Sequence, residues 1–253
     1  MRKLLAFSAA LILGASSLCA QEYTTYNPAG RWYVAVQGGP MYQSNENSFA
    51  YRYEHVGDKL ITYSGAVSVG YNFDEIYGLR ASVSYGLNRS AGNYKNSHWM
   101  FYPYDFKNIS AFLDLTLDIN GLNAVDKAFS PKLYGGIGLG HTFNFTKPAD
   151  KDNGGYGEPR TVAWQAEEKF HPWQHVYEKN NVFGFRFGFI AEYDFACGFG
   201  LFADFCLEAY LDRFNGLQPY EADHSGAGDT GKGYGGFPLD LRMPVSLGVL
   251  YRF

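Results

Sequence analysis

The sequence predicts an all-β fold, a transmembrane antiparallel up-and-down β-barrel of about eight strands. Long stretches alternate between apolar and polar or small residues with a period of two, which is the pattern of strands with two different faces. The 253 residues include 30 Gly, 21 Tyr and 21 Phe, and barrels use glycine where the wall curves and aromatic rings at the membrane interfaces. The mean hydropathy is -0.25, and no long apolar run follows the N-terminal one, which excludes helical spans.

The clearest alternation lies in residues 181–212, which we interpret as a hairpin turning at about 195–199. One face of each strand is apolar and rich in Phe, and the other holds charges of both signs together with glycines. Each strand matches the roughly 9–11 residues that a tilted strand needs to cross a bilayer. In a soluble sheet the apolar face is the core, whereas in a membrane barrel it faces lipid. The N-terminal and C-terminal segments of the chain favour the membrane barrel over the soluble sheet.

Residues 1–20 have the pattern of a cleaved signal peptide, with Arg2 and Lys3 before an apolar run and small Ala20 before the expected cut. The apolar run is shorter than the roughly 18–20 residues of a spanning helix, which disfavours an N-terminal anchor. Cys19 suggests a lipoprotein, but bulky Leu18 precedes it. Residues 21–253 are therefore expected to form one exported barrel domain.

The remaining strands follow from the same alternation. They are expected at about 31–42, 60–73, 77–88, 106–119, 131–145 and 243–253. Long connections are predicted after the first, third, fifth and seventh strands, including 89–105 and 146–180, and shorter ones after the others. This asymmetry is typical of membrane barrels, which have short turns at one end and long loops at the other. It places both termini at the end with the short turns.

The last strand ends the chain with apolar residues at alternate positions, and its final pair is Tyr251 and Phe253. This ending resembles the assembly signal of outer-membrane β-barrel proteins. The mature chain resembles the small OmpA/OmpX-type eight-stranded family of porin-like outer-membrane barrels. The resemblance implies the outer membrane of a Gram-negative bacterium, periplasmic termini and contact with outer-membrane lipid and lipopolysaccharide. It also implies assembly by the barrel-assembly machinery and no cofactor.

Ionisable residues on the predicted interior faces are the first group of candidate site residues. They could form an ion pathway or a gate, or they could form a paired polar core that fills a narrow barrel. A turn centred near Cys197 would place Arg186 directly opposite Glu208. The candidates for lumenal ion pairs are Arg80, Asp114, Asp118, Arg186, Glu192, Asp204, Glu208 and Arg252.

Aromatic residues in the predicted loops are the second group, because loops on a rigid barrel often carry recognition. They could bind an extracellular glycan or a protein partner, or they could belong to an interfacial aromatic belt. These candidates are Trp99, Tyr102, Trp164, Trp173, Tyr177 and Tyr220.

Catalytic and metal-binding motifs are weak. His141 lacks a serine two residues later, because that position is Phe143. Residues 223–225 read Asp-His-Ser, but consecutive loop residues rarely form a triad, which depends on spatial placement. His171 and His175 have the spacing of a helical metal pair, but Pro172 lies between them and no third ligand is evident. The two cysteines of the mature chain, in the turn and on the following strand, are expected to be free thiols.

The sequence therefore predicts a non-enzymatic outer-membrane barrel that acts structurally or through its long loops. A small porin-like pore is the alternative, and a lipid-modifying enzyme is the third interpretation. A soluble lipocalin-like barrel is disfavoured, because its water-facing side would carry charges of both signs beside a continuous Phe face. The net charge of -4 and pI of about 5.9 give no reason to propose nucleic acid as a partner.

Overall fold

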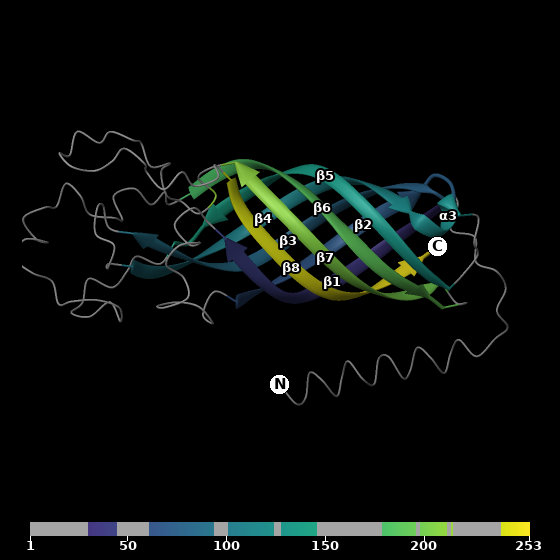
Figure 1. Cartoon of the computed structure of the whole chain (residues 1–253), viewed down its shortest axis with the longest axis horizontal. Coiled ribbons are helices and arrows are strands. Elements are labelled where there is room, and N and C mark those ends of the chain that lie inside the picture. The colour runs from purple at the N-terminus through teal and green to yellow at the C-terminus, as the bar shows by residue number, and fades with distance from the viewer. Residues whose placement is uncertain are drawn as a thin grey trace, which may run out of the picture.

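The computed structural model describes residues 30–44, 61–93, 101–123, 128–145, 179–195, 198–211, 214 and 239–253, with side chains omitted at 44, 90–93, 101–104 and 179. The predicted signal peptide, residues 1–20, lies outside these ranges. Figure 1 shows the strands wound obliquely around one axis. The elements are β1 (Arg31–Ser44), β2 (Ile61–Asn72), β3 (Tyr77–Asn93), β4 (Phe101–Asp118), α3 (Ile119–Leu122), β5 (Phe129–Phe143), β6 (Lys179–Asp194), β7 (Phe199–Leu211) and β8 (Leu239–Arg252).

The strands form one closed barrel in which every strand pairs with its neighbours in chain order. All pairs are antiparallel, and β8 returns to pair with β1, for example at Val36 and Val249. Closure removes the free sheet edges that would otherwise expose unpaired backbone groups. This confirms the predicted all-β, up-and-down barrel of eight strands. The helical segments among the described residues are all too short or too polar to cross a bilayer.

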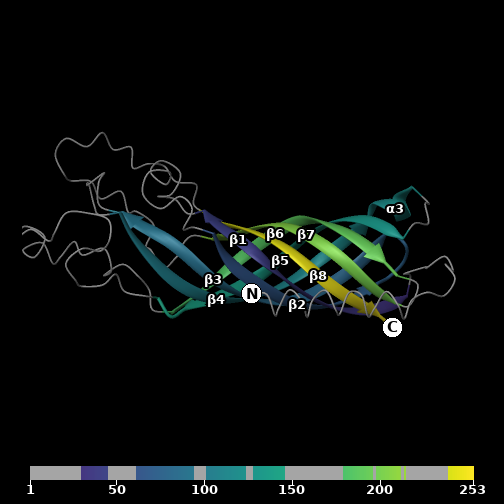
Figure 2. The ribbon, with the colours of Figure 1, turned by 90° about the horizontal axis from the view of Figure 1, so that it is seen from below.

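The two ends of the barrel differ. At the turn end lie the junctions around 73–76, 119–128 and 195–198 and the C-terminus. At the opposite end, the loop end, β1, β3, β5 and β7 finish, and the connections 45–60, 94–100, 144–178 and 212–238 follow them in the sequence. Figure 2 shows α3 and the C-terminus at the same end of the barrel. The predicted connection 89–105 was too long, because β3 and β4 continue through it and leave only 94–100. Tyr102 therefore lies on β4, opposite Gly92, and is not a loop residue.

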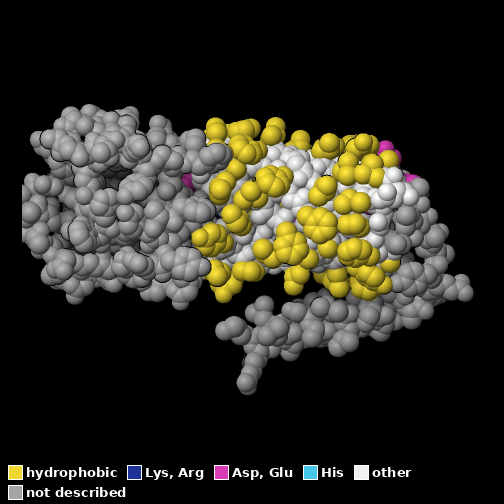
Figure 3. All heavy atoms as spheres, viewed as in Figure 1, with side chains coloured by type: hydrophobic (Ala, Val, Ile, Leu, Met, Phe, Trp, Pro, Cys, Tyr) yellow, Lys and Arg dark blue, Asp and Glu magenta, His cyan; other side chains and the backbone are white. Residues whose placement is uncertain are grey.

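The outer surface of the barrel is apolar. Large hydrophobic side chains at alternate strand positions are exposed, among them Leu247 at 72%, Leu139 at 62% and Phe187 at 59%. Figure 3 shows these side chains covering the visible face between the two ends, with acidic side chains only towards the ends. Monomeric soluble proteins rarely expose apolar patches of this extent. This outer surface suits lipid, as the alternation predicts.

Aromatic rings gather on the outer surface at the turn end. The Trp32 and Tyr71 rings lie 5.0 Å apart, and the Phe199 and Tyr251 rings lie 4.8 Å apart. The Tyr251 and Phe253 rings stack at 6.4 Å, and both side chains are exposed. Such a girdle is typical of the level where barrel wall, lipid headgroups and water meet.

The turn end is built by local backbone contacts. The Asp74 carboxylate accepts hydrogen bonds from the backbone N–H groups of Ile76 at 2.8 Å and Tyr77 at 2.6 Å, which closes the β2–β3 turn. α3 is a single helical turn where the sequence predicts only a plain turn. It begins after Asp118 and packs against the β2–β3 turn at Gly121, where a Cβ would lie 2.1 Å from the Glu75 carbonyl oxygen. Only glycine fits there.

Candidate functional site in the barrel interior

Side chains that point inward fill the barrel with polar and charged groups. All of the predicted lumenal candidates lie inside, because each occupies an inward position of its strand. They are at most 9% exposed: Arg80, Asp114, Asp118, Arg186, Glu192, Asp204, Glu208 and Arg252. The structure arranges them, with partners that the sequence did not reveal, in three levels along the barrel axis.

The central level is built around Asp114, which is fully buried on β4. Its carboxylate accepts hydrogen bonds from Arg80 Nε at 2.8 Å, from Arg186 Nε at 2.8 Å and from Arg186 Nη2 at 2.6 Å. Arg80 Nη1 also reaches Asp204 Oδ2 on β7 at 3.3 Å, and Arg186 Nη2 donates to Ser82 Oγ on β3. Two guanidinium groups and two carboxylates thus balance each other's charge.

Aromatic rings hold the two central guanidinium groups from the side. The Arg80 guanidinium lies 4.1 Å from the centre of the Tyr134 ring, and that of Arg186 lies 4.4 Å from the centre of the Phe112 ring. The Tyr134 hydroxyl donates a 2.7 Å hydrogen bond to Asp204 Oδ1. Cation–π contacts strengthen when the partners are removed from water. The central level is therefore a compact block rather than a lining around open space.

The level towards the loop end is built around Glu208. The predicted register is found, because Arg186 and Glu208 are directly paired across β6 and β7. Their charged atoms are 3.7 Å apart, however, whereas Arg242 Nη1 lies 2.6 Å from Glu208 Oε2. The Tyr210 hydroxyl also donates to Glu208 at 3.0 Å. Arg242 was missed because strand eight was predicted to begin at Met243, whereas β8 begins four residues earlier, at Leu239.

The level at the turn end contains two cations and three carboxylates. Lys132 Nζ lies 3.1 Å from both carboxylate oxygens of Glu192 and 3.8 Å from Asp118. The Arg252 guanidinium donates to both Glu192 and Asp194. Lys132 and Asp194 were missing from the predicted set, although the alternation of their strands places both on the same face as the charged candidates.

Apolar and aromatic groups fill the space between the charged levels, in two buried clusters. The glycines of β5 and β6 make room for the rings. A Cβ on Gly138 would lie 2.6 Å from the Phe112 ring, one on Gly184 2.7 Å from the Tyr210 ring, and one on Gly188 2.4 Å from the Tyr134 ring. The clusters are Phe106, Phe112, Val182, Tyr210 and Phe214 towards the loop end, and Tyr33, Ala35, Tyr134, Ile190, Phe202 and Leu250 towards the turn end.

Two phenylalanines from the connections close the interior at the loop end. Asn144 follows β5 in the left-handed region, with φ of 53°, and the next residue, Phe145, stacks on Phe106 with the ring centres 5.0 Å apart. Phe214 follows β7, is fully buried and stacks on Tyr210 at 3.9 Å. The described part of the loop end is therefore packed with aromatic rings.

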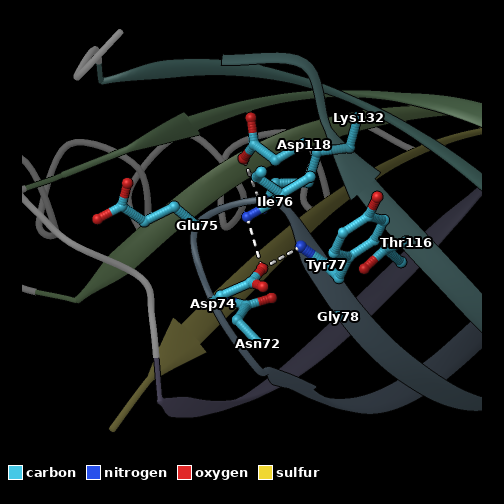
Figure 4. Close-up of a pocket in the computed structure, with 9 residues that line it drawn as sticks. All are labelled: Asn72, Asp74, Glu75, Ile76, Tyr77, Gly78, Thr116, Asp118 and Lys132. Carbon is cyan, nitrogen blue, oxygen red and sulfur yellow. Dashed lines mark hydrogen bonds and ion pairs between the residues drawn. The ribbon is translucent and has the colours of Figure 1, made fainter. Parts of the chain in front are cut away.

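The turn end holds a small pocket, shown in Figure 4, near the charged level of Asp118 and Lys132. Its lining residues are Asn72, Asp74, Glu75, Ile76, Tyr77, Gly78, Thr116, Asp118 and Lys132. The Asp74 carboxylate is used by the turn, and Asp118 accepts a hydrogen bond from Ser130. Within the described residues, no group of His, Cys, Asp and Glu side chains is arranged to hold a metal ion.

The structure describes only some of the other candidate residues. The side chain of Tyr102 is not described, and the following candidates lie outside the described residues: Trp99, Trp164, Trp173, Tyr177, Tyr220, His171, His175, Cys197 and residues 223–225. His141 lies on the outer face of β5, where its Nδ1 is 2.7 Å from Asn181 Oδ1. Cys206 is a free thiol that faces the interior.

Comparisons with known proteins find similarity in solved structures only. No family model matches the chain, and no curated protein does. One similar structure is the attachment invasion locus protein Ail of Yersinia pestis with a heparin analogue, at 12% identity over 89% of this chain and 99% of that chain, with a TM-score of 0.44. A second is Neisserial surface protein A, at 15% identity over 88% of this chain and 97% of that chain, with a TM-score of 0.44. A third is a major outer membrane protein of Thermus thermophilus, at 13% identity over 89% of this chain and 100% of that chain, with a TM-score of 0.46. Closed antiparallel topology, an apolar outside and a charged inside make the chain an eight-stranded β-barrel of the transmembrane type.

Proposed function

We propose that this chain is a non-enzymatic outer-membrane protein whose lumen is plugged, and that it acts structurally or through the connections at its loop end. The proposal includes a Gram-negative outer membrane with both termini on the periplasmic side. The observation that carries it is the central charged level, which joins opposite walls of the barrel.

The contact between Arg80 and Asp204 spans the lumen. Arg80 lies on β3 and Asp204 on β7, and in a ring of eight strands these two are diametrically opposite. Beside this contact, Asp114 on β4 and Arg186 on β6 form a second ion pair, in which Arg186 Nη2 lies 2.6 Å from Asp114 Oδ2. An ion that passed through the barrel would have to separate these pairs, and removing one partner of a buried pair costs about 3–5 kcal/mol.

The same block argues for a mechanical role. Hydrogen bonds and ion pairs that tie non-adjacent strands together hold the cross-section of the barrel constant, so the wall is a rigid base for the connections. Those at the loop end include the two longest, 144–178 and 212–238, and loops on a rigid scaffold are where recognition concentrates. A glycan or protein partner would be bound there.

Electrical recording tests the plugged lumen. The purified full chain is inserted into a planar bilayer, with an open porin as the positive control for insertion and recording. We expect no steady conductance from this protein, although brief openings are compatible with a plug that breaks occasionally. A large and steady conductance would refute the proposal and favour the porin-like alternative.

Complementation separates a structural role from loop binding. Cells that lack the chain receive either the full chain or a variant in which residues 151–176 are replaced by a short Gly-Ser linker, and both proteins are checked for barrel folding. If the role is structural, both restore the envelope's resistance to detergent. If the role is recognition, only the full chain restores adhesion to glycan-coated or protein-coated surfaces.

A further inference from the structure

Charged side chains on the outer face of the barrel gather in one place. Among strand residues whose side chains the structure describes, the lipid-facing positions carry only three charged residues, Arg89 on β3 and Asp105 and Lys107 on β4. All three lie at the loop end, where the β3–β4 hairpin extends beyond its neighbours. We call these three residues the outer charged patch.

Backbone pairing fixes the geometry of the outer charged patch. Arg89 and Asp105 are directly opposite, and the Arg89 guanidinium donates to the Asp105 carboxylate at 2.6 and 3.0 Å. Lys107 lies two residues after Asp105 on the same face and is the diagonal neighbour of Arg89, a spacing of about 7–8 Å between backbones. Lys107 makes no ion pair with any residue that the structure describes.

The surface next to the patch is shaped for acyl chains. Tyr85, Leu87, Ile109 and Leu139 occupy lipid-facing positions just nearer the middle of the barrel, and each is 43–62% exposed. The step from this apolar surface to two cations marks the level of lipid headgroups, since long basic side chains lay their stems on apolar surface and place their charge at the interface.

A second polar pair supports this level. His141 on β5 is paired with Ile109 across the β4–β5 ladder, two residues nearer the middle than the pair of Lys107 and Phe143. Its ring is hydrogen-bonded to Asn181 on β6, also on the outer face. Polar groups on four adjacent strands therefore replace apolar ones at about the same height.

We propose that the outer charged patch binds the phosphate headgroup of an anionic membrane lipid. Lys107 supplies an ammonium donor to the phosphate. The Arg89 guanidinium, whose Nε and Nη2 are bound to Asp105, contributes positive charge beside it. The three charges sum to one positive charge, so an anion is attracted to the patch, while the adjacent apolar surface holds the acyl chains. The inference rests on the proposed insertion in the outer membrane.

The test measures which lipid stays bound. The full chain is reconstituted in phosphatidylcholine vesicles with a minor fraction of phosphatidic acid, extracted in mild detergent and analysed by native mass spectrometry. We expect preferential retention of phosphatidic acid, a roughly fivefold loss of that preference in Lys107→Gln, as one cation near a membrane surface predicts, and a gain in Asp105→Asn. Arg31→Gln, which removes an exposed cation at the turn end, is the matched control.

Several results would overturn the site. The site is wrong if the unaltered protein retains phosphatidylcholine and phosphatidic acid equally. It is also wrong if Lys107→Gln keeps the full preference for phosphatidic acid, or if Arg31→Gln loses as much of that preference as Lys107→Gln does. Gel migration without heating checks that each protein is folded. If the unaltered chain does not insert into vesicles at all, the proposed function fails first and the site falls with it.

Discussion

Replacing Asp114 by Asn would remove the charge at which two buried arginines meet. The side chain keeps its size and one acceptor oxygen, but Arg80 and Arg186 lose the carboxylate that lies 2.6–2.8 Å from their nitrogens. Removing one partner of a buried ion pair costs about 3–5 kcal/mol. Two other carboxylates remain, Asp204 at 3.3 Å from Arg80 and Glu208 at 3.7 Å from Arg186. We therefore expect the free energy of unfolding to fall by about 3 kcal/mol, at the lower end of that range.

Urea unfolding in lipid vesicles measures this loss, with tryptophan fluorescence and gel migration as two independent readouts of the folded state. Ser84→Ala is the control for an inward substitution, because Ser84 makes only one side-chain hydrogen bond to the residues that the structure describes, a long one of 3.5 Å to the Ser110 carbonyl. The double variant Asp114→Asn with Arg186→Met should lose less stability than the sum of the two single changes.

The reasoning would be refuted by a change of less than about 0.5 kcal/mol for Asp114→Asn, the size of an ordinary surface substitution. It would also be refuted by additive losses in the double variant, since residues in one buried network should be coupled. The neighbouring Leu113, which faces outward and is 49% exposed, provides a scale. Leu113→Arg places a charge in lipid and should cost about 2–4 kcal/mol.

Two further predictions follow from the interior packing. In double-mutant cycles, Glu208 should couple more strongly to Arg242 than to Arg186, because the charged atoms are 2.6 Å apart in the first pair and 3.7 Å in the second; equal coupling energies would contradict this ranking. Gly136→Ala should lower stability by about 1–3 kcal/mol, since its Cβ would lie 2.2 Å from Oδ1 of Asp114. Gly135→Ala should be almost neutral, because its Cβ would meet nothing nearer than the Arg186 carbonyl oxygen at 3.8 Å. Urea midpoints of the two variants compare them directly, and similar midpoints would count against the tight inner wall.

The faces and the local pairing of strands could be predicted from the sequence. A period of two assigns every residue of a long strand to one side of the wall, so Arg80, Asp114 and Glu208 were placed inside without a structure. The short turn between β6 and β7 fixed their register, and Arg186 and Glu208 are paired as expected. Both inferences rest on residues that are neighbours in a strand or across one turn.

Contacts between non-adjacent strands could not be predicted in this way. Alternation says that Asp114 points inward, but it does not say that Arg186, two strands away, reaches it at 2.6 Å. Without that contact, Asp114→Asn looks far milder than Leu113→Arg, whereas with it the expected losses of stability are similar. Strand ends were the other weakness, since strand eight was predicted to begin at Met243, which left Arg242 in a connection although it lies on β8.

The glycine-lined stretch of wall in β5 and β6 has a consequence for engineering. Phe112, Tyr134 and Tyr210 occupy volume that the missing side chains of this stretch leave free, as Tyr33 does at Gly70 of β2 and Phe202 at Gly248 of β8. Trimming these three rings would open space beside the wall at β5 and β6 while the hydrogen-bonded ladder stays intact. A designer who wants a conduit would therefore carve this side first and leave the number of strands unchanged.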